Sequence, residues 1–175
     1  VNERLQFTHG YGLAMSPVSV VNEDGFPNYL IQDLPPATEK GLTVDQPAIY
    51  YGESMPGYRI VNTDIEEFDY PKGDQNVYTR YEGKGGIPVI GLFRKLLFAW
   101  DQSEFNILLT GSLREGSLIQ IHRELVDRVR SVAPFLRLDE DPYLVLADGR
   151  LQWIQDAYTV SSGYPYSEPF FRGLN

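Results

Sequence analysis

The chain has 175 residues, 42% of them hydrophobic, and a formal net charge of -9. This length and composition predict a single folded domain over residues 1–175, whereas the acidic balance argues against nucleic acid or an anionic membrane surface as a partner, because both are bound through Lys and Arg. The absence of cysteine excludes disulfides, thiolate zinc sites and cysteine nucleophiles.

The first half of the chain is rich in Gly, Pro and Asn and shows little helical periodicity. A turn is expected at Asp24-Gly25, and the doublet Pro35-Pro36 predicts an extended linker. Six short strands are predicted from apolar and aromatic patterns, at residues 17–21, 29–33, 48–51, 58–62, 67–70 and 77–81.

The middle of the chain changes to helical spacing. Residues 92–100 are apolar on nearly every side except Arg94 and Lys95, so this helix is expected to be largely buried. Residues 104–110 form either a second short helix or a strand, because the run is too short for periodicity to decide. The preceding segment, residues 83–86, lacks the Lys-Ser/Thr ending of a phosphate loop and is interpreted as a flexible connector.

A long amphipathic helix is predicted over residues 117–133. The side chains that fall on one arc at 100° per residue are Leu118, Ile121, Leu125, Val129 and Val132. Ser117 is placed as the N-cap, and Pro134 ends the helix. On this wheel Arg123 lies on the solvated face, and His122 lies within the apolar arc, where a buried, hydrogen-bonded imidazole is expected.

A β-hairpin is predicted after the acidic turn at residues 139–141, since Asp148-Gly149 is typical of a two-residue type I′ loop. In antiparallel register Leu146 faces Leu151 and Leu144 faces Trp153. The predicted fold is therefore α+β, with a mixed or antiparallel sheet covered by helices and ending in this hairpin, whose apolar face the helix at residues 117–133 is expected to cover.

Few residues suggest a serine or histidine chemistry. The segments at residues 9–12 and 52–57 together resemble an oxyanion loop and a nucleophile elbow around Ser54, but Pro56-Gly57 leads into a strand where an elbow needs a helix. A hairpin turn is the favoured interpretation. His9 lies in a glycine-flanked loop, where exposure would allow a functional role, although no spacing links it to a second ligand.

Carboxylates supply two further hypotheses. Asp139, Glu140 and Asp141 offer oxygen ligands to Ca²⁺, but they lack the alternating ligands and glycine of an EF-hand loop, so turn chemistry is favoured. Glu67, Asp69 and Asp156 could provide a glycosidase pair, which only their spatial separation can test. The sequence assigns no catalytic residue, metal or cofactor. Most of the 12 tyrosines and nine phenylalanines are expected in the core.

Several ordered motifs resemble a known family. They include the segments at residues 8–12, 46–53, 67–71 and 94–99 and, in the last third, residues 133–136, 141–143, 148–151, 153–154, 156–159 and 164–167. Together these motifs are similar to uncharacterised protein family 0182, large bacterial membrane proteins with several N-terminal spans and a long soluble portion. The resemblance implies a segment that follows the membrane spans and lies outside the cytoplasmic membrane, and it implies no reaction.

No apolar run within the chain is long enough to span a bilayer. Because Val1 is not a start methionine and no signal-peptide pattern follows it, the chain is expected to be a piece of a longer protein, which the resemblance places in the cell membrane. The leading hypothesis is a noncatalytic extracytoplasmic module that serves binding, assembly or transport at the envelope. Its partners would be the remainder of its own membrane-embedded chain and an envelope component. The alternative is a hydrolase that acts on an envelope polymer through paired carboxylates.

Overall fold

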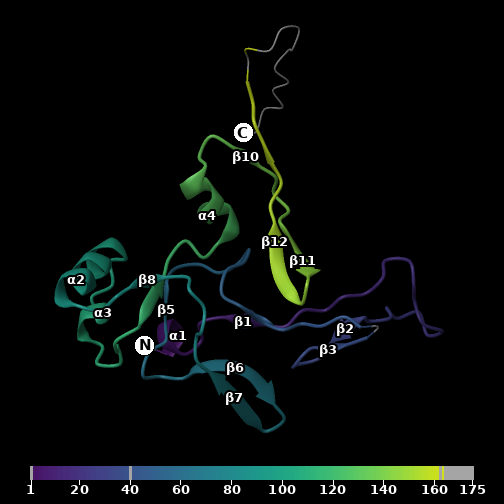
Figure 1. The fold of residues 1–175 in the computed structure, drawn as a ribbon, viewed down its shortest axis with the longest axis horizontal. Helices are drawn as coiled ribbons and strands as arrows, with labels where there is room; N and C mark the ends of the chain where they lie inside the picture. Colours follow the sequence, from purple (N-terminus) through teal and green to yellow (C-terminus); the bar gives the residue numbers. More distant parts are fainter. Residues whose placement is uncertain (1, 40, 162, 164–175) are drawn as a thin grey trace.

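The computed structural model describes residues 2–39, 41–161 and 163, and its helices and strands are short (Figure 1). The helices are α1 (Asn2–Leu5), α2 (Leu92–Asp101), α3 (Asn106–Leu109) and α4 (Leu125–Val132). The strands are β1 (Gly10–Tyr11), β2 (Ile31–Gln32), β3 (Ala37–Thr38), β4 (Ala48–Ile49), β5 (Arg59–Val61), β6 (Glu67–Lys72), β7 (Gln75–Thr79), β8 (Ile87–Pro88), β9 (Leu118–Gln120), β10 (Arg137–Leu138), β11 (Tyr143–Ala147), β12 (Arg150–Ile154) and β13 (Ala157–Tyr158). None of the helices in the described ranges has the length and apolar content that a membrane crossing needs.

The hydrophobic core forms around a three-stranded antiparallel sheet in the order β5-β9-β8. Ile119 lies in the middle strand, opposite Ile60 on one side and Ile87 on the other, and it is completely buried. Helices α1, α2 and α3 each contribute a buried side chain to this cluster, namely Leu5, Ala99 and Ile107. The core therefore brings together residues from the beginning and from the end of the segment 1–120.

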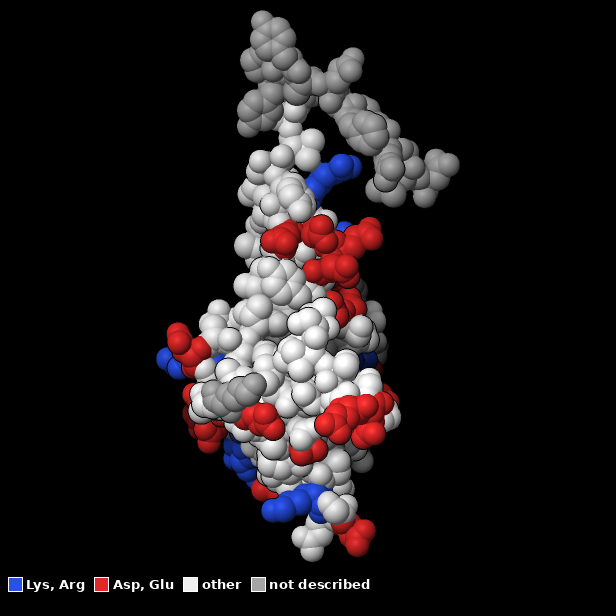
Figure 2. Space-filling view, turned by 90° about the vertical axis from the view of Figure 1, so that its right-hand side faces the viewer, with Lys and Arg blue, Asp and Glu red and all other residues white. Residues whose placement is uncertain are grey.

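The other described strands pair two at a time, as β1-β4, β2-β3, β6-β7, β10-β13 and β11-β12. Every ladder between these strands is antiparallel, and together with the helices they agree with the predicted α+β class. The prediction of one sheet covered by helices is not confirmed for the described residues. Their strand pairs form separate small sheets that project in different directions from the core (Figure 1). Asp and Glu side chains outnumber Lys and Arg on the face shown in Figure 2, as the net charge of -9 leads one to expect.

The prediction of a helix over residues 117–133 is wrong for the first half of this segment. Residues 118–120 form β9 instead, and His122 adopts a φ of 48°, which an α-helix does not allow. Only residues 125–132 are helical, as α4, and Ser117 lies before a strand. The apolar spacing suits a helix, but Ile119 is more fully buried as the central residue of a sheet, and this tertiary contact decides the conformation.

Helix α2 confirms the predicted helical segment but not its burial. Ala99 is its only buried residue, whereas Leu92 and Phe93 are each 73% exposed and Trp100 is 84% exposed. Helix α2 therefore packs on the core through a narrow side around Ala99, and most of its other apolar side chains are exposed. Residues 104–110, for which helix and strand were both open, contain the short helix α3.

The predicted hairpin is confirmed with its register. Leu146 faces Leu151, Leu144 faces Trp153, and Asp148 and Gly149 have positive φ angles of 50° and 74°. Strand β12 ends at Ile154, and the following β13 pairs with β10 rather than continuing the hairpin. The Trp153 indole donates a 2.9 Å hydrogen bond to the Tyr51 carbonyl oxygen.

The remaining strands of the first half appear in part. Strands β2, β4, β5, β6 and β7 lie within or overlap five of the predicted segments. No strand forms at residues 17–21, where Val21 makes only an isolated bridge to Pro27. Gly, Pro and Asn in this region favour turns over continuous ladders.

A glycine substitution tests the packing of the central sheet. Gly86 has a φ of 125°, and a Cβ placed there would lie 2.9 Å from Leu118 Cβ and 3.2 Å from the Ile119 carbonyl oxygen. Gly86→Ala is therefore expected to lower the free energy of unfolding by about 2 kcal/mol, from backbone strain and from contact with β9. Gly73, with a φ of 58° and nothing within 4 Å of a Cβ, provides the control. Urea denaturation should show a smaller loss for Gly73→Ala, and equal losses would contradict the close packing at Gly86.

Candidate functional site

A polar cluster lies beside the core, built from residues far apart in the sequence. Five residues make up this polar cluster: Thr8, His9, Glu67, Asp69 and Arg123. Thr8 and Glu67 are completely buried, the His9 side chain is 0% exposed, and Arg123 is 3% exposed. The segment after α1, strand β6 and the loop before α4 bring these side chains together. Buried ionisable groups need hydrogen-bond partners, so the contacts of each one define the site.

Glu67 accepts four hydrogen bonds. The hydroxyls of Thr8 and Tyr50 donate to Oε2, the latter at 3.1 Å. The backbone amides of Asn62 and Tyr81 donate to Oε1 at 3.0 and 3.1 Å. Burial raises the pKa of Glu67, but the nearby His9 ring and the hydrogen bonds from Thr8 and the two amides outweigh burial, so this pKa lies below its ordinary value of 4.5. Glu67 is therefore an ionised carboxylate inside the protein.

His9 lies between the two carboxylates. Its Nε2 is 3.1 Å from Asp69 Oδ1, and its Nδ1 is 2.9 Å from Thr8 Oγ1 and 3.7 Å from Glu67 Oε2. Because the Thr8 hydroxyl hydrogen is donated to Glu67, Nδ1 must donate its own hydrogen to Thr8 Oγ1. The Nε2 contact completes a chain of hydrogen-bonding groups that runs from Asp69 through His9 and Thr8 to Glu67.

Arg123 completes the cluster through backbone oxygens. Its Nε donates to the Tyr50 carbonyl oxygen at 2.9 Å, and its Nη2 donates to the Thr8 carbonyl oxygen at 2.6 Å. Among the described residues no carboxylate lies within ion-pair distance of Arg123. Burial, and then the charge of Arg59, lower the pKa of Arg123 to about 10, so it remains a cation at neutral pH. Its role is to tie the loop before α4 to β4 and to the N-terminal segment.

Tyrosine rings surround the polar cluster. The Tyr50 ring lies 4.6 Å from the His9 ring and 4.7 Å from the Tyr81 ring, and the Tyr11 ring lies 4.7 Å from the Tyr70 ring. Burial and the adjacent Glu67 carboxylate raise the pKa of Tyr50, so its hydroxyl stays a hydrogen-bond donor. These contacts fix the rings in place next to Asp69.

A pocket of about 410 Å³ opens beside the cluster. It is lined by side chains of the β1-β4 pair, the β6-β7 pair and the loop after β7, among them Tyr11, Gln46, Tyr50, Asp69, Arg80 and Glu82. The Asp69 side chain is 16% exposed, whereas Glu67 and His9 lie behind it. Asp69 is therefore the residue of the polar cluster that both lines the pocket and contacts the buried His9.

Comparison with known proteins identifies a family but no activity. The profile of an uncharacterised protein family, UPF0182, matches residues 1–174. The chain belongs to this family. UPF0182 proteins of Sulfurovum sp. and Trichodesmium erythraeum are each 50% identical over the whole chain, and one of Methanospirillum hungatei is 45% identical over 99% of it. The chain spans about a fifth of the length of these relatives, and no solved structure matches it.

In this UPF0182 chain the structure brings together two of the three carboxylates considered for a glycosidase pair. Glu67 and Asp69 both face His9, whereas Asp156 is exposed beside β13. Glu67 is 0% exposed and fully hydrogen-bonded, so it cannot reach a substrate. The expected exposure of His9 is wrong, because its glycine-flanked loop folds inward against β6.

The expectations for the other candidate residues have mixed outcomes. His122 is exposed, not inward-facing, because the predicted helix is absent around it. Arg123, expected in solvent, is buried for the same reason. Ser54 lies in an exposed turn followed by β5, which confirms a turn rather than a nucleophile elbow. At the acidic turn, Asp139 Oδ1 accepts a hydrogen bond from the Asp141 amide, and no group of three potential metal ligands occurs among the described residues.

Sequence patterns missed Thr8 and Arg123. Thr8 adjoins His9, but a single hydroxyl in a loop gives no periodic signal. Arg123 stands in a run of alternating charges, and the helical wheel assigned it to solvent. Residues 83–86, interpreted as a connector, make defined contacts: Gly83 lines the pocket and the Gly85 amide donates to the Tyr81 hydroxyl at 2.8 Å.

Proposed function

We propose that the chain is a noncatalytic extracytoplasmic module of a longer cell-membrane protein and that it packs against the rest of that protein. The observation that carries this proposal is an exposed apolar surface on α2 and α3, which we call the α2–α3 face. Its side chains are Leu92, Phe93, Leu96, Leu97, Trp100, Phe105 and Leu109, each between 49% and 84% exposed.

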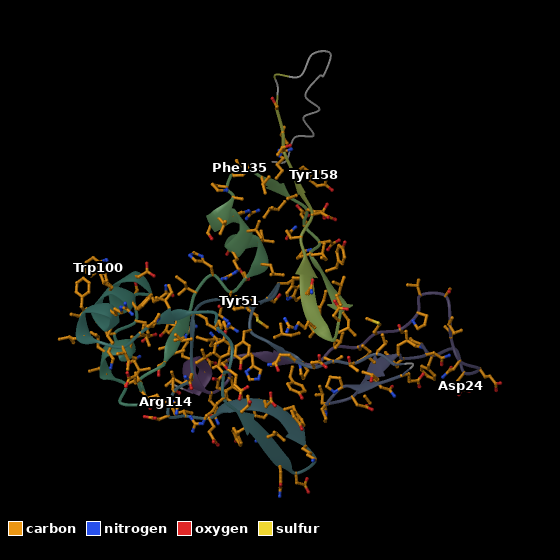
Figure 3. The ribbon with its side chains drawn as sticks, in the orientation of Figure 1. Asp24, Tyr51, Trp100, Arg114, Phe135 and Tyr158 are labelled. Carbon is orange, nitrogen blue, oxygen red and sulfur yellow. The ribbon has the colours of Figure 1, made fainter. Side chains whose placement is uncertain are left out.

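The α2–α3 face is unusual for a surface that meets only water. Trp100 and Leu109 are more than 80% exposed, and Figure 3 shows Trp100 at the outer end of the molecule. Contiguous apolar surface of this kind marks a contact with another protein or with a membrane. Covering these side chains would gain hydrophobic free energy at about 25 cal/mol per Å².

The remainder of the same protein is the proposed occupant. The relatives are about five times as long as the chain, so most of the polypeptide in such a protein lies outside these residues. A covalently connected partner is always present at high effective concentration, which suits an apolar face that would otherwise cause aggregation. Membrane attachment and the outside location rest on the family resemblance, and a role in envelope binding, assembly or transport follows from that location.

Cysteine labelling tests both the docking and the location. The chain contains no cysteine, so Trp100→Cys and Asp24→Cys each introduce one thiol, and these two residues lie at opposite ends of the molecule (Figure 3). In the isolated chain both thiols should react with a maleimide. In the longer protein, Asp24→Cys should react in intact cells with a membrane-impermeant maleimide, whereas Trp100→Cys should be protected.

Three results would contradict the proposal. Equal labelling of both thiols in the longer protein would show that nothing covers the α2–α3 face. Labelling of Asp24→Cys only after the cytoplasmic membrane is opened would place the module inside. Sedimentation of the isolated chain as a dimer in which Trp100→Cys is protected would assign the face to a second copy instead.

The pocket beside Asp69 gives some support to the alternative, a hydrolase acting on an envelope polymer. Two carboxylates, Asp69 and Glu82, line it together with the tyrosines. However, Asp69 Oδ1 already contacts His9 Nε2 at 3.1 Å, and the buried Glu67 cannot serve as its catalytic partner. The noncatalytic module is therefore the preferred proposal.

A further inference from the structure

We infer that the pocket beside Asp69 binds an organic cation that carries a primary ammonium group. This binding site is separate from the proposed docking through the α2–α3 face, because the pocket is formed by β1, β4, β6, β7 and the loop after β7. Its volume of about 410 Å³ falls within the range of small-molecule sites.

The charges at the pocket favour a cation. Asp69 and Glu82 line it, and Arg80 is the cationic side chain among the lining residues described. Arg80 is already engaged, since its Nη1 donates to the Thr63 carbonyl oxygen at 2.8 Å and its Nη2 lies 3.6 Å from Glu66 Oε1. An incoming anion would meet the two carboxylates without a free basic partner, whereas an ammonium group would meet charges of opposite sign.

His9 faces Asp69 from the interior and leaves the pocket side of the carboxylate for a ligand. His9 Nε2 lies 3.1 Å from Asp69 Oδ1. Among the described residues no hydrogen bond is made to Asp69 Oδ2, and the side chain is partly exposed to the pocket. A donor on the ligand can therefore reach Asp69 without displacing His9.

The aromatic walls add a second attraction for a cation. Tyr50 uses its hydroxyl for Glu67, so it contributes its ring to the pocket lining. Tyr11 lines the pocket too and is held by its contact with Tyr70. Ring faces attract ammonium groups by about 0.5–2 kcal/mol each, depending on desolvation. Because the rings and Asp69 are fixed by contacts of their own, binding requires little ordering of the protein.

The experiment compares two probes of equal length that differ in charge. 1,5-Diaminopentane and 1,5-pentanediol are titrated into the intact chain, and binding is followed by calorimetry and by NMR shifts of residues that line the pocket. The diamine should bind and the diol should bind at least about tenfold more weakly. N-acetyl-lysine amide, which carries the same ammonium group on a peptide unit, shows whether the pocket prefers a free diamine or a lysine side chain.

Variants locate the interaction. Asp69→Asn and the exposed Glu82→Gln should each weaken diamine binding by about tenfold. Glu115→Gln removes the same charge from an exposed residue that does not line the pocket and has no ion pair among the described side chains, so it should change the affinity by less than about twofold. Since Asp69 also contacts His9, Glu82→Gln provides the test that is independent of folding.

Three outcomes would overturn the inference. No binding of the diamine to the unaltered chain would exclude an ammonium site. Equal binding of the diol would show that the pocket recognises hydroxyl donors, as in a carbohydrate, and not charge. Equal weakening by Glu115→Gln and Glu82→Gln would show a diffuse effect of net charge.

Discussion

Glu67→Gln is expected to lower the free energy of unfolding by about 3–5 kcal/mol, the largest effect of any substitution considered for this chain. An amide has one acceptor oxygen, whereas the Glu67 carboxylate accepts hydrogen bonds from two hydroxyls and two backbone amides. At least one donor in the cluster would face the amide NH₂ group and lose its partner. Urea denaturation at neutral pH, followed by tryptophan fluorescence, measures the loss.

The neighbouring Glu66 supplies the matched control. Its side chain is 59% exposed and makes a single 3.6 Å ion pair with Arg80. Glu66→Gln should therefore change the free energy of unfolding by less than about 0.5 kcal/mol. Similar losses for the two variants would show that Glu67 contributes only its charge and not its hydrogen bonds.

The same carboxylate predicts a dependence on pH. Because the pKa of Glu67 is lower in the folded protein than in the unfolded chain, its stabilisation is complete above the ordinary pKa of 4.5. It is lost as the pH falls from that value through the lowered pKa of the folded state. The difference in unfolding free energy between the unaltered chain and Glu67→Gln should therefore shrink in acid. A difference independent of pH would contradict an ionised Glu67.

Arg123→Met is expected to cost about 3 kcal/mol. Methionine preserves much of the apolar stem but leaves the carbonyl oxygens of Tyr50 and Thr8 without the guanidinium donors. Each buried acceptor left unpaired costs about 1–3 kcal/mol, and removal of the buried charge offsets a part of this. The loss should appear in the same urea denaturation experiment.

Arg130→Met in α4 is the control for Arg123→Met, because Arg130 is exposed. It should change the free energy of unfolding by less than about 0.5 kcal/mol. Equal losses would indicate that Arg123 acts through general charge. A stabilised Arg123→Met variant would show that the desolvation of the arginine outweighs its two hydrogen bonds.

Local chemistry explains what the sequence predicted correctly. The Asp148-Gly149 pair favours positive φ angles at two successive positions, and this turn determines the register from Ala147↔Arg150 outward. Helix α2 likewise follows from the spacing of its own residues. Glu67 and Asp69 both fall in the strand predicted at residues 67–70, which the structure contains as part of β6.

The failures involve contacts between distant parts of the chain. Residues 118–120 have a pattern compatible with helix or strand, and only the positions of β5 and β8 make the strand preferable. The burial of α2 was overestimated because periodicity shows which residues share a side, but not whether anything covers that side. Arg123 binds the Thr8 carbonyl oxygen across 115 residues of sequence, a contact that no local pattern contains.

The middle position of β9 has a consequence for synthesis on the ribosome. Strands β5 and β8 both hydrogen-bond to β9 and not to each other, although both precede it in the chain. As the polypeptide emerges, Ile60 and Ile87 cannot pair with Ile119 until β9 has been synthesised. Arg123, which donates hydrogen bonds in the polar cluster, follows Ile119 by four residues. A nascent chain that stops before Leu118 has neither its central strand nor a closed polar cluster, so folding of this region is coupled to the emergence of its final third.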